Sequence, residues 1–149
     1  MAEDATLEIK RLYDAPPERV FDAWMQREQW QAWIGPEGTQ SDVPLHEPHV
    51  GGRYKVVMNL SNGQTMPIVG VFKTVERPSR IAFTWALETH PPDLLAHDSL
   101  VTITLRDAGN GKTELTLRHD NLVTTENRDQ HGRGWNSALN KLETFLGRA

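Results

Sequence analysis

The sequence predicts an α+β fold in which a curved antiparallel sheet of six to seven strands wraps around a long C-terminal helix, with two short helices after the first strand. Three observations support this fold class. Stretches with the two-residue period of strands fill the middle of the chain, and a stretch with helical period ends it. Four of the five tryptophans lie in helical stretches near the two ends, and a Trp-rich helix face needs a large apolar surface to cover.

The first strand is predicted over residues 6–13. Leu7 and Ile9 alternate there with charged side chains, which is the pattern of a half-buried strand. The apolar phase shifts at Leu12-Tyr13, so we expect the strand to end or bulge there.

Two short helices are predicted next. Pro17 suits the first turn of a helix, where its missing N–H costs nothing, and Trp24 lies on the apolar face that follows. A second helix covers residues 28–33 and ends before Gly35.

Antiparallel strands are predicted across residues 41–119, because alternating segments are separated by turn signals. Asn62-Gly63 is a strong hairpin signal. Pro67 predicts that the strand after this turn begins late or lies at a sheet edge, since proline cannot donate a ladder hydrogen bond. Residues 88–98 are expected to form an irregular loop. The individual strands are predicted over residues 53–60, 68–75, 80–87, 100–106 and 113–119.

The last helix is predicted over residues 124–146, where apolar side chains recur at helical spacing. Gly132 and Gly134 inside this helix each cost about 1 kcal/mol relative to alanine. We therefore expect either a close approach of another backbone or a local break there. The predicted inward stripe consists of His131, Trp135, Ala138, Leu139, Leu142 and Phe145 or Leu146.

Composition excludes several classes of protein. The 149 residues predict one domain over residues 1–149, and the lack of cysteine removes thiol chemistry and disulfides. A net charge of −4 with interspersed signs argues against a nucleic-acid surface. The acidic N-terminus is no secretion signal and no apolar run is long enough to span a membrane, so a cytoplasmic location is expected.

Several short motifs follow one another along nearly the whole chain, at residues 15–24, 33–36, 51–54, Gly70, Pro78, 113–116 and Gly134-Trp135. Together they resemble the START-like, helix-grip superfamily, also called SRPBCC. Within it, the chain is similar to the subfamily related to the C-terminal domain of the activator of a heat-shock chaperone's ATPase. The chain departs from this subfamily at His49, where the subfamily commonly carries a basic arginine before the double glycine, so the resemblance implies no anion-handling role there.

The resemblance implies a central cavity that binds lipids, sterols, polyketides or hormones, and in some members a cyclase activity. Large apolar side chains of the predicted inward faces are the candidate lining of such a cavity, or they form an ordinary core. His131 is a candidate hydrogen-bonding group, since it lies one helical turn before Trp135. The predicted ligand-binding residues are Trp24, Trp33, Met58, Phe72, Phe83, Trp85, His131, Trp135 and Leu139.

Catalytic and metal motifs find little support. The serines have no nucleophile-elbow context, and no His-Glu-x-x-His helix is present. The histidines considered as metal ligands are interpreted as surface or loop residues, and no metal or cofactor is predicted. As an acid or base, His131 would need a partner such as Glu88, Asp93 or Asp98. The other histidines considered as ligands are His46, His49, His90 and His97.

The function that these patterns favour is binding of a small hydrophobic molecule in a cavity between the sheet and the C-terminal helix, without catalysis. One alternative is a co-chaperone that stimulates a heat-shock chaperone ATPase in a stress response. The other is a cyclase, dehydratase or hydrolase that acts on a cavity-bound substrate. The predicted partner is a small apolar ligand, and the sequence leaves a homodimer and a chaperone partner open.

Overall fold

The computed structural model describes residues 5–88, 99–122 and 125–147. Its sheet has seven strands in the order β1-β7-β6-β5-β4-β3-β2, and all neighbours are antiparallel. This sheet, the two short helices and the C-terminal helix confirm the predicted fold class. The elements are β1 (Ala5–Tyr13), α1 (Pro17–Met25), α2 (Arg27–Trp33), β2 (Gln40–His46), β3 (Arg53–Asn59), β4 (Thr65–Glu76), β5 (Arg80–Leu87), β6 (Ser99–Gly109), β7 (Lys112–Leu122) and α3 (Thr125–Leu146).

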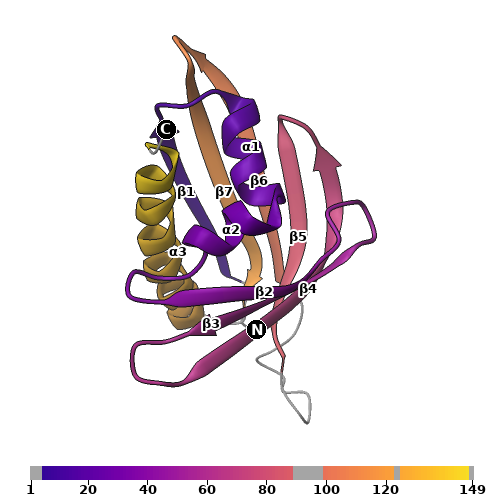
Figure 1. Ribbon diagram of the computed structural model, residues 1–149, viewed down its shortest axis with the longest axis vertical. Helices are drawn as coiled ribbons and strands as arrows, with labels where there is room; N and C mark the ends of the chain where they lie inside the picture. The colour runs from indigo at the N-terminus through magenta and orange to yellow at the C-terminus, as the bar shows by residue number, and fades with distance from the viewer. Residues whose placement is uncertain (1–4, 89–98, 123–124, 148–149) are drawn as a thin grey trace.

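The sheet bends sharply along β4, whose first part runs with β2 and β3 and whose last part lies beside β5 (Figure 1). The β4–β5 register shifts between Phe72 and Thr74. At Gly70 a Cβ atom would collide with the Thr84 carbonyl, which already accepts a 2.6 Å hydrogen bond from the Tyr54 hydroxyl. Because only glycine fits this close approach, Gly70 allows the bend that makes one face of the sheet concave.

Strand β1 ends at Tyr13, one of the two outcomes expected from the phase shift at Leu12-Tyr13. It pairs with β7 without interruption from Leu7 to Tyr13, and a register shift lies between Ala5 and Leu7. No bulge therefore occurs at Leu12-Tyr13. Leu12 is 56% exposed on the outer face, while Tyr13 is buried and continues the inward series of Leu7 and Ile9.

Strand β4 also differs from its prediction, since it begins before Pro67 and lies between two strands rather than at an edge. The Pro67 carbonyl accepts a hydrogen bond from the Glu88 backbone N–H, just beyond the end of β5. In an antiparallel strand the nitrogen and carbonyl of one residue point to the same side. The proline nitrogen therefore faces the end of β5, and no bond to β3 is lost.

Helix α3 lies across the concave face beside β1 (Figure 1). It is continuous through both glycines. A Cβ at Gly132 would lie 3.3 Å from the Leu7 side chain, so this glycine permits close packing of α3 on a side chain of β1. The expected backbone contact or break is therefore not found at Gly132. The Tyr13 hydroxyl donates to the Leu139 carbonyl at 3.0 Å, and burial raises the pKa of this tyrosine. Position 124 of the predicted helix and residues 89–98 of the predicted loop lie outside the described residues.

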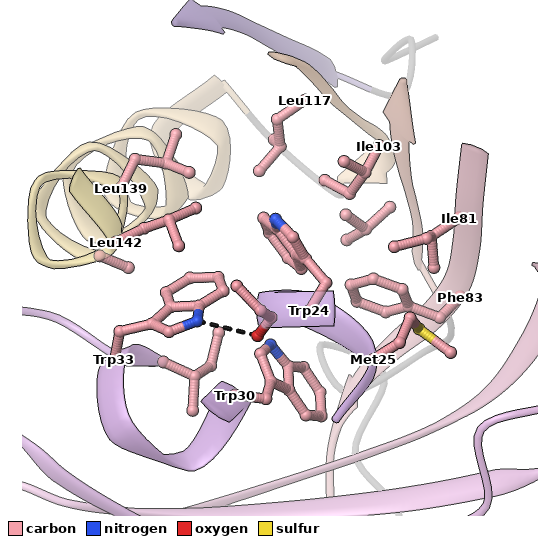
Figure 2. Packing of buried hydrophobic residues seen from close by; sticks show 14 of the residues in the cluster. Trp24, Met25, Trp30, Trp33, Ile81, Phe83, Ile103, Leu117, Leu139 and Leu142 are labelled. Atoms are coloured by element: carbon pink, nitrogen blue, oxygen red, sulfur yellow. Dashed lines mark hydrogen bonds between the residues drawn. The ribbon is translucent and has the colours of Figure 1, made fainter. Parts of the chain in front are cut away.

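A core of aromatic and aliphatic side chains fills the space between α1, α2, α3 and the sheet (Figure 2). Trp24 packs edge-on against Trp33, with ring centroids 4.7 Å apart. The Trp33 indole N–H donates to the Ala23 carbonyl at 3.0 Å, which fixes α2 against α1. The tryptophans of the short helices thus anchor these helices to the sheet.

Candidate functional site

A cavity of about 410 Å³ opens between α3, the loop after α2 and the inner face of the sheet. This volume lies within the usual range of small-molecule sites, about 300–1,000 Å³. Most of the lining is apolar. The lining residues are Ile34, Gly35, Pro36, Met58, Met66, Ile68, Trp85, Ala86, Leu87, Ser99, Asn121, Leu122, Gln130, His131, Gly134, Trp135 and Ala138.

The nine side chains predicted to bind a ligand fall into two groups. Met58, Trp85, His131 and Trp135 line the cavity. The other five are buried in the core that supports the cavity; they are Trp24, Trp33, Phe72, Phe83 and Leu139. Both groups lie on inward faces, and periodicity alone cannot tell them apart.

Two indole rings form the inner wall of the cavity. The ring centroids of Trp85 and Trp135 lie 4.9 Å apart. Behind them, Trp24 packs against Trp135 at 5.9 Å and Phe83 packs against Trp85 at 6.3 Å. Because these second rings belong to the buried core, their packing holds the wall in place.

A chain of buried polar groups adjoins this wall, and one of its members, Ser99, also lines the cavity. The Trp135 indole N–H donates to His119 Nδ1 at 3.1 Å. His119 Nε2 lies 2.6 Å from the Ser99 hydroxyl oxygen, and this hydroxyl donates to the Trp85 carbonyl at 2.7 Å. The chain joins α3 to β7, β6 and β5, so one set of hydrogen bonds links the helix to three strands.

The direction of each bond follows from the indole, which can only donate. His119 Nδ1 must therefore accept, and in a neutral ring the proton lies on Nε2. This N–H donates to Ser99. Burial, assisted by the nearby His131, lowers the pKa of His119 from its ordinary value of 6.5 to about 3. His119 is thus neutral near pH 7, with its tautomer fixed.

This bond direction determines what the Ser99–His119 pair can do chemically. A general base for the serine would need a free lone pair facing the hydroxyl. The nitrogen that faces Ser99 carries a proton, and the other nitrogen is occupied by Trp135. The pair is therefore a structural link rather than a nucleophile and its base.

Sequence analysis did not single out His119 and Ser99, although a signal was available. In β7, His119 continues the inward series of Thr113, Leu115 and Leu117. In β6, Ser99 begins the inward series that continues through Val101. A polar residue at the end of an inward apolar series predicts a buried polar group that needs a partner.

His131 lies half-buried beside this chain of bonds. Its ring packs edge-on against His119, with centroids 4.9 Å apart. Of the acidic partners considered for it, Asp93 and Asp98 lie outside the described residues. Glu88 forms an ion pair with Lys55 at 2.8 Å.

The loop that follows α2 is held against α3 by polar contacts. Lys141 Nζ lies 3.3, 3.5 and 3.2 Å from the carbonyls of Gly35, Pro36 and Thr39. The Glu37 backbone N–H donates to the Ser137 hydroxyl at 2.7 Å. Burial lowers the pKa of Lys141. These bonds position Gly35 and Pro36 at one side of the cavity.

His46 and His49 do not line the cavity. The interpretation of His46 as a surface or loop residue is wrong, because it lies in β2 and packs between Trp30 and Phe72, and burial lowers its pKa. His49 is exposed and contacts the Val50 carbonyl, while His90 and His97 lie outside the described residues. Among the residues that the structure describes, no three His, Asp or Glu side chains gather as a metal site requires.

The bent antiparallel sheet closed by a C-terminal helix, with a cavity between them, defines a START-like, helix-grip protein. The chain belongs to the AHSA1 family, described as Activator of Hsp90 ATPase homolog 1-like protein, whose model matches residues 14–147. No curated protein matches the sequence. In the described part of the chain, no helix is long and apolar enough to cross a membrane.

Solved structures of bacterial proteins share this fold. A protein from Chromobacterium violaceum is 26% identical with a TM-score of 0.87, over 97% of this chain and 98% of the other. An AHSA1 protein from Silicibacter pomeroyi is 29% identical with a TM-score of 0.81, over 95% and 97%. A protein from Rhodobacter sphaeroides is 25% identical with a TM-score of 0.78, over 97% and 95%.

Proposed function

We propose that this chain is a single START-like domain that binds a small apolar molecule in the cavity between α3 and the sheet, and that it does so without catalysing a reaction. The observation that carries the proposal is the inner wall. Trp85 and Trp135 present apolar rings to the cavity, and the polar groups that adjoin them are bonded to one another.

The physical reason is the hydrophobic effect. An apolar ligand that enters a preformed cavity of about 410 Å³ removes its own surface and that of the wall from water. The wall needs no rearrangement, because the core rings and the bonds of His119 already fix it. Among the described residues, no comparable observation favours a chaperone partner or a reaction.

The proposal is tested by filling the cavity. Gly134 lies on α3 and lines the cavity, and a Cβ there would meet only Pro36, at 4.0 Å. Gly134→Leu therefore adds a side chain to the cavity and removes the helix cost of glycine, about 1 kcal/mol. Arg133→Leu adds the same side chain at an exposed neighbouring position and serves as the matched control.

The probe is N-phenylnaphthylamine, an uncharged apolar dye, titrated while its fluorescence is measured. We expect about one dye per wild-type chain, and in Gly134→Leu an affinity lower by about tenfold or more, which corresponds to about 1.4 kcal/mol. The control should bind like the wild type. Equal affinities of wild type and Gly134→Leu, with the variant folded, would mean that the dye binds elsewhere and that the cavity is not the site.

A further inference from the structure

The Ser99 hydroxyl has one unused hydrogen-bonding position. A serine hydroxyl has one donor and two acceptor positions. Its donor goes to the Trp85 carbonyl at 2.7 Å, and one acceptor position receives the His119 Nε2–H at 2.6 Å. These are its partners among the described residues. One acceptor position is left on a side chain that is 5% exposed and lines the cavity.

We propose that Ser99 makes the cavity selective for ligands that bear a hydrogen-bond donor, such as an alcohol or a phenol, over ligands that bear a carbonyl at the same place. This inference rests on the proposed function and names the chemical class of the ligand. The ligand hydroxyl donates to the unused acceptor position of Ser99, while its hydrocarbon part lies against Trp85 and Trp135.

The surrounding bonds keep Ser99 from adapting to a carbonyl. To donate to a ligand, the serine would have to release the Trp85 carbonyl. His119 cannot compensate by accepting from the serine, because its Nδ1 is already occupied by the Trp135 N–H and its Nε2 carries the proton. A protonated His119 would carry a hydrogen on both ring nitrogens, so it could not accept from the serine either. A ligand carbonyl at this point would therefore face a lone pair and be buried without a donor.

The other polar groups of the cavity differ from Ser99. The Trp135 indole N–H is used by His119. Asn121 and Gln130 are exposed, and His131 is half-buried. A polar ligand group near these three residues would meet both donors and acceptors, whereas one that bonds to Ser99 meets an acceptor. The selectivity thus belongs to Ser99.

The experiment compares three probes with one bicyclic skeleton: α-tetralol, α-tetralone and tetralin, which differ only in an alcohol, a ketone or a methylene. Isothermal titration calorimetry near pH 7 measures the affinity of each. We expect the wild type to bind the alcohol about fivefold tighter than the ketone, or more. Ser99→Ala should bring the two affinities to within about twofold of each other.

Two variants serve as controls. Ser99→Thr retains the hydroxyl and should retain the preference for the alcohol. Ser41→Ala removes another buried hydroxyl, which donates to the Ile34 carbonyl at 2.8 Å and does not line the cavity, so it should leave the preference unchanged.

The outcomes separate this inference from the proposed function. If the wild type binds all three probes equally, or prefers the ketone, the inference is wrong while the proposed function stands. A preference that survives in folded Ser99→Ala also overturns it, because another group then carries the selectivity. If Ser99→Ala does not fold, the ratio of the wild-type affinities for the alcohol and the ketone still tests the inference, since a ratio near one contradicts it. Failure of all three probes to bind contradicts the proposed function itself.

Discussion

The buried His119 makes the stability of this protein depend on pH. The folded state holds the pKa of His119 at about 3, against 6.5 for an unperturbed histidine, chiefly because the ring is buried. Between these two values the unfolded chain binds more protons than the folded one. Stability therefore rises with pH in this window, and the contribution of His119 is lost as the pH falls from about 6.5 toward about 3.

The size of the effect follows from the shift. Each pH unit inside the window changes the free energy of unfolding by about 1.4 kcal/mol. Between about pH 7 and about pH 4.5, the wild type should lose about 2.5 kcal/mol through His119. That is a large share of the ~5–15 kcal/mol that holds a typical domain folded.

The assay is urea unfolding at several pH values for the wild type and His119→Gln. Glutamine has no titrating group and can still donate or accept a hydrogen bond. The carboxylates are common to both proteins, so their titration cancels in the difference between the two curves. We expect the variant to be less stable at pH 7, and the gap to shrink by about 2.5 kcal/mol at pH 4.5. Parallel curves would refute the neutral, buried state of His119.

Two further predictions concern the bend and the cavity. Gly70→Ala should lower the free energy of unfolding by at least about 3 kcal/mol or prevent folding, because the new Cβ would collide with the Thr84 carbonyl. Gly134→Ala has room for its Cβ and should be neutral or stabilising by up to about 1 kcal/mol. Thermal unfolding of both variants measures the two effects, and equal stabilities would contradict this reasoning. His131→Gln should weaken binding of the apolar dye by no more than about tenfold, as expected for one hydrogen bond, and a larger loss measured by dye titration would assign His131 a central role.

Much of the fold could be predicted from local patterns. Alternation along β5, helical spacing along α3 and the Pro17 start of α1 each specify an element without reference to the rest of the chain. Prediction was wrong at Pro67, where a neighbouring strand decided the outcome. Pro67 is tolerated inside β4 because its nitrogen faces the end of β5.

The candidate site was less accessible to prediction. Trp85 and Phe83 have the same inward phase on one strand, yet Trp85 lines the cavity and Phe83 lies in the core. The difference depends on where α3 and the loop around Gly35 lie over the sheet, and these contacts join residues about a hundred positions apart. No periodicity within a strand contains that information.

The sequence by itself determined the order of elements, the inward faces and the long apolar stripe of α3, because these depend on side-chain period and on the backbone preferences of proline and glycine. Only the tertiary structure decided which inward side chains border the cavity, and it alone joined Trp135, His119, Ser99 and Trp85 in one directed set of hydrogen bonds. These residues come from a helix and three strands, and their bonds exist only once the sheet has bent and the helix has packed across it.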